Sequence, residues 1–391
     1  MTTTNLIRDF KADLDFFFSE RLNRPLAKPY WVFFSLTHRC TYDCQMCGVK
    51  SILTEHDLDI ALIKRSLDEV AGWGTDCTVL FTGGEAFLRK DIFEIIGYSV
   101  SLGLTTEVVS NGSLIDEKIA GRIMASGLSN IAISLDGATA ATHDHIRGVK
   151  GAFEKSLGAL KLLSREKAAH SHKQGPQISA WTTMMRENVH ELYDIIQVAR
   201  NAGVECLVYH PVIVSQADMQ NTIAGGHLWI TPELLGAFKV EIDKLVEYRR
   251  LHGLVAELHD PYQWIGYFQG SLSRKDWTCN PFVFIDIGPD GNVRSCGPSF
   301  GSIKDMSLTE CLHTAAADQA RERMRVCQKP CLQTCWARPG TDSLGVIVNN
   351  FTARLDRAGL PAEEKTVLLA ESLKLVEHYE TLVTGDGKDG R

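Results

Sequence analysis

The sequence predicts the α/β class: a partial barrel of alternating strands and helices, followed by a small C-terminal α+β domain. Short apolar segments alternate with helical segments six times in the first half of the chain. These segments are apolar on both faces, which is typical of parallel strands covered by helices. Six units are two short of a closed eightfold barrel, so we expect an open, TIM-like (β/α)6 barrel.

The elements follow in order along the chain. Residues 1–30 form a short helical lead-in. The expected strands are 31–37, 77–84, 104–112, 129–137, 176–184 and 204–214, and the helices between them are 60–74, 91–103, 116–127, 152–167 and 189–203. Glycine at position 74 is a typical helix stop. Chemistry in such a barrel gathers where the strands end at their carboxyl edge.

The second half of the chain is less regular. A helix is expected at 232–253, two short strands joined by an Asp290-Gly291 turn at 283–297, a helix at 308–326 and an amphipathic helix at 363–383. The predicted units are the lead-in (1–30), the barrel (31–214), a connecting helical region (215–278), the small α+β domain (279–340) and a C-terminal helical tail (341–391).

Charge and composition exclude some function classes. The formal net charge of -7 argues against a dedicated nucleic-acid or anionic-membrane surface. No apolar stretch is long enough to span a bilayer, and the first residues mix charges into apolar positions, unlike a signal peptide. Eight of the eleven cysteines fall in two clusters, which indicates a cytoplasmic metalloprotein rather than a disulfide-bonded one.

The first cysteine cluster directly follows the first strand. Cys40, Cys44 and Cys47 lie within eight residues. Three thiolates at this spacing can hold one face of an iron–sulfur cubane and leave one iron open for a ligand. The alternative is a zinc site completed by His38 or His56.

This triplet, together with the turns that end the next strands, resembles the radical SAM superfamily over about residues 31–214. The resemblance implies a [4Fe-4S] cluster on the three cysteines, with S-adenosylmethionine (SAM) bound at the open iron. It implies reductive cleavage of SAM to a 5′-deoxyadenosyl radical that abstracts hydrogen from a substrate. The family usually has an aromatic residue just before the third cysteine, where this chain has Met46.

The resemblance also implies which residues contact SAM. The turn after the second strand contains two glycines, which allow close approach of the backbone to a ligand, and Glu85, whose charge suits an ammonium group. Arg147 suits the SAM carboxylate, with a surface salt bridge as the alternative. The expected cofactor-binding residues are Gly83, Gly84, Glu85, Ser110, Asn111, Ser134, Asp136 and Arg147. Val208 and Tyr209 are weaker candidates to flank the adenine, and His143 and His145 are expected in a loop.

The second cysteine cluster resembles the SPASM or shortened twitch extensions of some radical SAM enzymes. Cys279 and Cys296, with Gly291 between them, match the Cys…Gly-x-x-x-x-Cys hairpin of those extensions. This implies one auxiliary [4Fe-4S] cluster, completed by two of Cys327, Cys331 and Cys335, with Cys331 and Cys335 favoured. Structural zinc is the alternative. Cys77, Cys206 and Cys311 are expected to be packing residues.

Three functions compete. The preferred one is an oxidoreductase acting on a small molecule of sugar, cyclitol or nucleoside type, because about 30 residues precede the barrel and leave no room for a peptide-recognition module. The alternative is a peptide or protein maturase that modifies ribosomal peptides with a separate recognition protein. The third is a non-catalytic Fe–S or zinc protein. An electron donor such as flavodoxin or ferredoxin is the expected partner of either enzyme. His210, Tyr262 and Trp264 are possible pocket residues, as is Tyr209.

Overall fold

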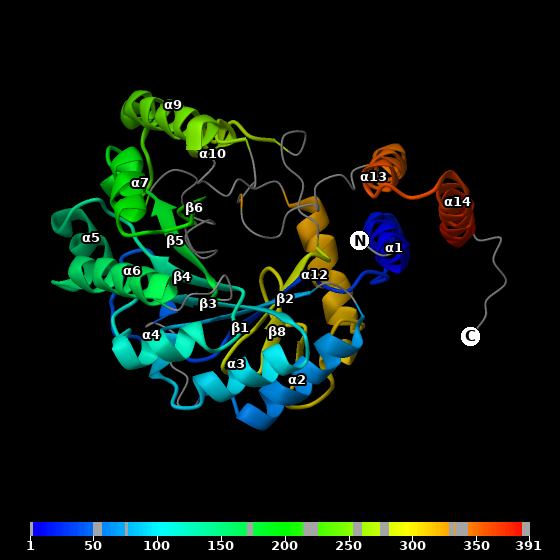
Figure 1. Cartoon of the computed structure of the whole chain (residues 1–391), viewed down its shortest axis with the longest axis horizontal. Coiled ribbons are helices and arrows are strands. Elements are labelled where there is room, and N and C mark those ends of the chain that lie inside the picture. Colours follow the sequence, from blue (N-terminus) through cyan, green and yellow to red (C-terminus); the bar gives the residue numbers. More distant parts are fainter. Residues whose placement is uncertain are drawn as a thin grey trace.

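The computed structural model describes residues 3–49, 57–74, 77–169, 175–213, 226–252, 260–273, 281–327, 332 and 343–384. Within these residues one sheet has nine strands in the order β6-β5-β4-β3-β2-β1-β7-β8-β9, and the helices of the barrel cover its outer face (Figure 1). The first seven strands in that order are parallel, and the sheet stays open between β6 and β9. The prediction of an open, partial barrel of six βα units is confirmed.

The barrel elements lie close to where the sequence predicts them. The strands are β1 (Trp31–Ser35), β2 (Thr78–Thr82), β3 (Thr105–Ser110), β4 (Asn130–Ser134), β5 (Gln177–Met184) and β6 (Cys206–Pro211). The helices are α2 (Ile60–Gly72), α3 (Ile92–Ser101), α4 (Glu117–Met124), α5 (Ala140–Arg147), α6 (Ala152–Ala169) and α7 (Leu192–Asn201). Side-chain caps start several of them: Asp59 accepts from the backbone N–H of Ala61 in α2, and Asp116 accepts from that of Ile119 in α4.

Helix α5 is absent from the expected elements. Its sequence is polar and lacks an apolar stripe, so periodicity misses it. Thr139 caps its start, and Gly148, with φ of 68°, ends it in the left-handed conformation. His143 and His145 therefore lie on a helix and not in a loop, and Arg147 is the last residue of that helix.

The second half of the chain differs more from expectation. The helix expected at 308–326 is broken into α11 (Leu308–Cys311) and α12 (Ala315–Val326), because Thr314 starts a new cap by accepting from the N–H of Ala317. The predicted hairpin is present as β7 (Phe284–Ile287) and β8 (Asn292–Arg294), followed by β9 (Gly301–Ser302). Its first strand pairs in parallel with β1, so the hairpin extends the barrel sheet. Beyond the barrel, α9 (Leu235–His252) lies beside α7, and α10 (Gln263–Gln269) lies beside α9.

The two ends of the chain meet in a second hydrophobic core. Helix α1 (Thr3–Leu22) packs against α13 (Leu344–Arg357) and α14 (Ala362–Thr384) at one side of the barrel (Figure 1). The rings of Phe10 and Phe351 are 4.5 Å apart, and Arg354 Nη2 lies 3.0 Å from Asp13 Oδ2. The predicted lead-in and tail thus form one helical unit with its own core.

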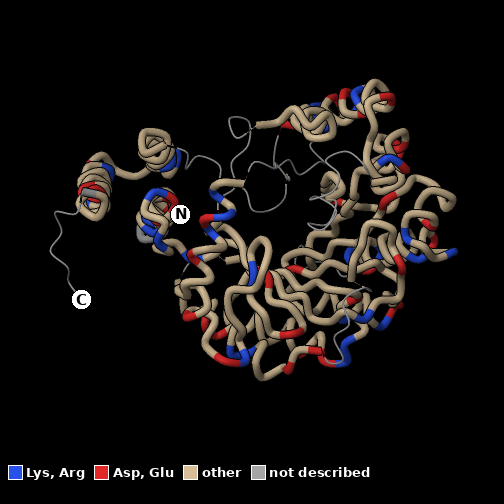
Figure 2. Tube along the Cα trace, turned by 180° about the vertical axis from the view of Figure 1, so that it is seen from behind, with Lys and Arg blue, Asp and Glu red and all other residues tan. Residues whose placement is uncertain are grey.

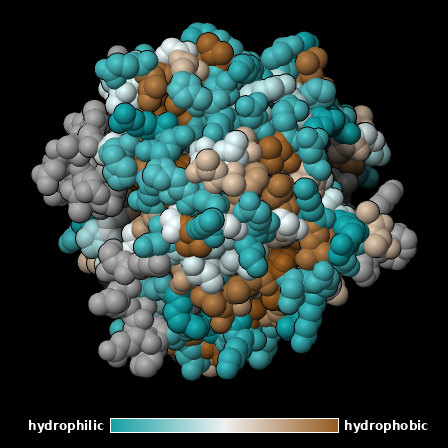
Figure 3. Space-filling view, turned by 90° about the vertical axis from the view of Figure 1, so that its left-hand side faces the viewer, coloured by the Kyte–Doolittle hydropathy of each residue, from teal (hydrophilic) through white to brown (hydrophobic). Residues whose placement is uncertain are grey.

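The surface carries both signs of charge. Lys and Arg residues are mixed with Asp and Glu residues along the described part of the trace (Figure 2). The side on which α5 and α6 lie is mostly hydrophilic, with a band of apolar residues across it (Figure 3). None of the described helices combines the length and apolar character needed to cross a bilayer.

Candidate active site

The three cysteines of the first cluster lie on a loop at the carboxyl edge of the sheet, between β1 and α2. Cys40 and Cys44 are partly buried and Cys47 is exposed. The N–H of Cys47 donates to the carbonyl of Cys44 over 3.1 Å, which turns the chain between these two residues. Burial raises the pKa of Cys40 and Cys44, and Cys47 adds to the rise for both, so the three thiols are close enough to influence one another electrostatically.

The two glycines after β2 let this cysteine loop approach. A Cβ on Gly84 would lie 2.1 Å from the carbonyl oxygen of Arg39, and one on Gly83 would lie 2.5 Å from that of Thr37. Gly83 also has a φ of 121°, which L side chains rarely adopt. The N–H groups of Gly84 and Glu85 donate to the carbonyls of Thr37 and Arg39 over 2.7 and 2.8 Å. The close backbone approach predicted here is therefore made to the cysteine loop.

Glu85 joins two turns from inside the protein. Its side chain is fully buried, and Oε1 accepts from Ser110 Oγ over 2.9 Å and from the N–H of Phe87. Oε2 accepts from the N–H of Asn111 over 2.8 Å. Burial raises the pKa of this carboxyl, and the three donors oppose the rise. The carboxylate thus holds the turn after β3 against the turn after β2, and its contact with the ammonium group of SAM stays a prediction.

Asn111 reaches the cysteine loop. Its Nδ2 donates to Thr41 Oγ1 over 2.9 Å and lies 3.7 Å from Cys40 Sγ. Its Oδ1 accepts from the N–H of Ser113. The side chain predicted to bind ribose hydroxyls is therefore bonded to the segment that carries the first cysteine.

Asp136 and Arg147 form a buried ion pair beside Cys44. Arg147 Nη2 contacts Asp136 Oδ2, and Arg147 Nη1 donates to Cys44 Sγ over 3.6 Å. Asp136 is fully buried, and its Oδ1 accepts from the N–H of Thr183 over 2.7 Å. Arg147 is 8% exposed, so the surface salt bridge offered as an alternative is not what the structure has. Ser134 lies at the end of β4, directly before this pair in the chain.

Two buried polar atoms next to Cys44 lack partners. Arg147 Nε and the Tyr42 hydroxyl have no hydrogen bond to any described residue. Leaving a buried donor unsatisfied costs about 1–3 kcal/mol, so an acceptor bonded to either atom would be stabilising. Donors of this kind suit a carboxylate, such as that of SAM. Sequence reasoning overlooked Tyr42, because nothing in its spacing separates it from an ordinary core residue.

His143 lies behind the turns that carry Asp136 and Asn111 and connects them through hydrogen bonds. The sequence did not predict this supporting role. Its Nδ1 accepts from the N–H of Asp136 over 3.1 Å, and its Nε2 lies 3.3 Å from Ser156 Oγ. Ser156 Oγ donates to the carbonyl of Asn111 over 2.9 Å. Burial lowers the pKa of His143 to about 3, so the ring is neutral and links the turns that carry Asp136 and Asn111.

The second cysteine cluster is described only in part. Cys296 is exposed and Cys327 is partly buried, at the end of α12. Cys279, Cys331 and Cys335 lie outside the described residues. Cys77 and Cys311 are buried, in agreement with packing roles, and Cys206 is partly buried. No three described His, Cys, Asp or Glu side chains converge on one metal ion; in a cubane each thiolate binds a different iron.

Some pocket candidates point away from the barrel interior. Tyr209 donates its hydroxyl to the carbonyl of Leu192 in α7 over 2.5 Å, so it faces the helices and does not flank a ligand inside the barrel. Its neighbour His210 consequently faces inward, where its ring lies 5.1 Å from that of Trp181. Trp264 is buried beside Tyr209, and Tyr262 is 43% exposed. Burial lowers the pKa of His210 to about 4.

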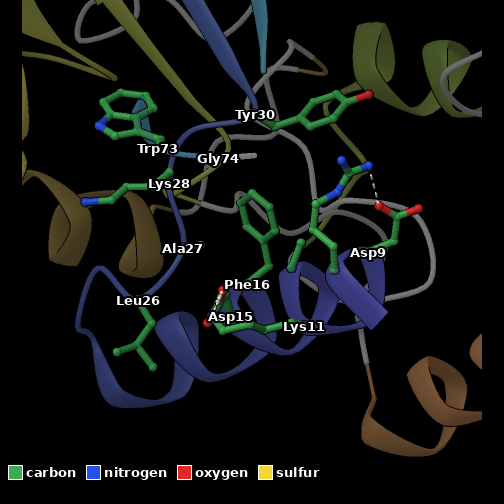
Figure 4. A pocket seen from close by; sticks show the side chains of 12 residues that line it. Asp9, Lys11, Asp15, Phe16, Leu26, Ala27, Lys28, Tyr30, Trp73 and Gly74 are labelled. Carbon is green, nitrogen blue, oxygen red and sulfur yellow. Dashed lines mark hydrogen bonds and ion pairs between the residues drawn. The ribbon is translucent and has the colours of Figure 1, made fainter. Parts of the chain in front are cut away.

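A cavity of about 270 Å³ lies at the opposite edge of the sheet (Figure 4). It is lined by residues of α1 and by Lys28, Tyr30 and Trp73. Tyr30 comes immediately before β1, whereas the cysteines follow that strand. The cavity is therefore separate from the candidate active site.

Comparisons with known proteins agree with this geometry. A family model described as the radical SAM superfamily matches residues 34–199. An AdoMet-dependent heme synthase of Methanosarcina barkeri is 32% identical over 184 residues, which is 46% of this chain and 50% of that protein. A PqqA peptide cyclase of Xanthomonas campestris is 27% identical over 293 residues, 72% of this chain and 73% of that protein. The match to the heme synthase thus spans half of its length.

Solved structures share the fold. Native anSMEcpe with bound AdoMet and Cp18Cys peptide aligns with a TM-score of 0.60 at 15% identity, covering 90% of this chain and 99% of that one. At this identity the likeness establishes the fold alone.

Proposed function

Since residues 34–199 belong to the radical SAM superfamily, we propose that this protein is a radical SAM enzyme that modifies a peptide or protein substrate. The proposal rests on how much of this chain is similar to the PqqA peptide cyclase of Xanthomonas campestris. That peptide cyclase is similar over 72% of this chain, whereas the heme synthase is similar over 46% of this chain. These relatives favour the peptide alternative over the sugar, cyclitol or nucleoside oxidoreductase expected from the sequence.

The family's cofactors are a [4Fe-4S] cluster and SAM, which together supply a 5′-deoxyadenosyl radical able to remove hydrogen from a substrate. Cys40, Cys44 and Cys47 would hold the cluster. Arg147 Nε and the Tyr42 hydroxyl would receive the SAM carboxylate, since both are buried donors in need of an acceptor. Glu85, Asn111 and His143 keep the surrounding turns in place.

The auxiliary cluster is part of the proposal. Cys296 follows the β7–β8 hairpin, and Cys279 precedes it in the sequence. Two of Cys327, Cys331 and Cys335 would complete the ligand set. Because β7 pairs with β1, the hairpin that carries Cys296 is anchored on the barrel itself. The electron donor would be a flavodoxin or ferredoxin, in the cytoplasm.

The inner face of the barrel suits a peptide. Trp181 Nε1 is buried without a partner among the described residues, and the neutral ring of His210 lies against the same indole. Uncharged donors and acceptors of this kind match amide groups. A tetrapyrrole is the second candidate, favoured by the 32% identity to the heme synthase. Its carboxylates call for cations other than Arg147, which is paired with Asp136 and is assigned above to the SAM carboxylate.

The enzyme activity is tested directly. The protein reconstituted anaerobically with iron and sulfide, reduced with dithionite and given SAM is expected to form 5′-deoxyadenosine. Cys40→Ala should abolish this product and lower the iron content by about four per chain, the content of one cubane. Equal product from wild type and Cys40→Ala would refute the enzyme function.

The substrate class is tested separately. Short peptides encoded beside the gene, and iron-coproporphyrin III, are each incubated with the active enzyme and analysed by mass spectrometry. We expect loss of hydrogen from a peptide. Conversion of the porphyrin with no change in any peptide would show that the substrate is a tetrapyrrole and not a peptide.

A further inference from the structure

Two of the three cysteine sulfurs in the first cluster receive a side-chain donor. Asn111 Nδ2 lies 3.7 Å from Cys40 Sγ, and Arg147 Nη1 lies 3.6 Å from Cys44 Sγ. Within the described residues, no side chain donates to the exposed Cys47 in this way. The donors differ in kind, because Asn111 is neutral and Arg147 carries a full positive charge.

The charge beside Cys44 is one end of a buried pair. Arg147 is held on its other side by Asp136, whose side chain is fully buried. The order in space is therefore carboxylate, guanidinium and sulfur. In such an environment of low dielectric constant, a charge acts on its neighbours more strongly than in water.

Charged side chains beside the ligand sulfurs change the reduction potential of an iron–sulfur cluster. A one-electron reduction adds negative charge, with no bond or proton exchanged. Positive charge and hydrogen bonds at the ligand sulfurs stabilise the reduced state and raise the reduction potential. A buried carboxylate close by has the opposite effect.

We propose that Arg147 and Asp136 are positioning residues that set the reduction potential of the first cluster through Cys44, Arg147 raising it and Asp136 lowering it. The inference rests on the proposed ligation of the cluster by Cys44. It assigns Arg147 a task besides that of meeting the SAM carboxylate, because Nη1 faces the sulfur while Nε is the atom left without a partner. Asn111 adds a smaller upward effect at Cys40, since its donor is neutral.

The test is a redox titration of the reconstituted full-length protein, followed by electron paramagnetic resonance. The signal of the first cluster is identified by its change on addition of SAM. We expect Arg147→Met to shift the potential to more negative values and Asp136→Asn to shift it to more positive values. The double variant R147M/D136N, which removes both charges, should lie between the single variants. Arg354→Met, which removes an arginine paired with Asp13 in the helical unit, should leave the potential unchanged.

The opposite signs separate an electrostatic role from a structural one. If the pair only supported the fold, both single variants would disturb the cluster in the same direction. Shifts of one sign, or no shift in either variant, would overturn the inference. Should Arg147→Met fail to take up iron, Asp136→Asn carries the test, and the absence of a positive shift would be decisive.

Failure of the inference is distinguishable from failure of the proposed function. If wild-type protein shows no SAM-dependent change of signal and forms no 5′-deoxyadenosine, the proposed function is wrong. If both are present and the potentials do not move as stated, only the role of Arg147 and Asp136 is wrong.

Discussion

At the scale of single residues, the site depends on polar groups that act from behind it. His143 is buried, neutral and bonded to the turn that carries Asp136. Glu85 is buried and satisfied by three donors from neighbouring turns. Both side chains fix the positions of residues around the cysteine loop.

The pKa of His143 makes a prediction about acid stability. In the unfolded chain the ring takes up a proton near its usual pKa of 6.5, while in the folded protein its pKa is about 3. Between these values the unfolded state binds more protons, so this residue makes stability fall as the pH drops below about 6.5. We expect wild type to lose about 1 kcal/mol more unfolding free energy than His143→Gln between about pH 7 and pH 5.5.

Urea unfolding at the two pH values measures this difference. His145→Gln is the matched control, since His145 lies two residues further along the same helix and is exposed. It should keep the pH dependence of wild type. Equal pH dependence in wild type and His143→Gln would contradict the burial of a neutral ring.

At the scale of elements, the cysteine loop is held by backbone contacts with two neighbours. It lies on the glycine turn after β2 on one side. On the other side, the N–H groups of Asp43 and Gln45 donate to the carbonyls of Arg147 and Ile146 at the end of α5. The turn and the helix end thus form the support of the loop.

The glycine turn gives a prediction at this scale. Gly84→Ala would place a methyl group against the carbonyl of Arg39 and push the cysteine loop away from the sheet. We expect a loss of about 1–3 kcal/mol, as for other overpacked positions, and lower iron content after reconstitution. Circular dichroism should show that the fold is kept.

Gly97→Ala is the control for Gly84→Ala, because an added methyl group at position 97 has space. Gly97 lies in α3, and a Cβ there would meet nothing within 4 Å. Gly97→Ala should therefore bind iron like wild type and gain about 0.5–1 kcal/mol, because alanine is favoured over glycine within a helix. Normal iron content in Gly84→Ala would mean that the turn does not position the loop.

At the scale of the whole molecule, two hydrophobic cores stand side by side. The barrel core is formed by the strands and their covering helices, and the second core by α1, α13 and α14. Residues of α1 also take part in a contact with the β7 region, through Phe16 and Phe282. The two ends of the chain therefore stabilise each other beside the sheet that carries the site.

Phe351 tests the independence of the second core. It is 1% exposed and its ring lies 4.5 Å from that of Phe10, so Phe351→Ala should cost about 3–5 kcal/mol. Because this core lies away from the cysteine loop, we expect thermal unfolding of the helices at lower temperature while 5′-deoxyadenosine formation at low temperature persists. Val367→Ala, at a position on α14 that is 54% exposed, should change stability by about 0.5 kcal/mol or less. Loss of product in Phe351→Ala at low temperature would show that the helical unit supports the site.

The sequence by itself determined the alternation of strands and helices, the open barrel and the grouping of cysteines, because these depend on short-range periodicity and spacing. It also placed Glu85, Asn111 and Asp136 after strand ends, which parallel strands bring to one edge. Only the tertiary structure decided what those side chains bond to and how the ends of the chain pack. Arg354 meets Asp13 across 341 positions of sequence, and β7 joins β1 from the far half of the chain. Such contacts depend on the packing of distant segments, and no local pattern encodes them.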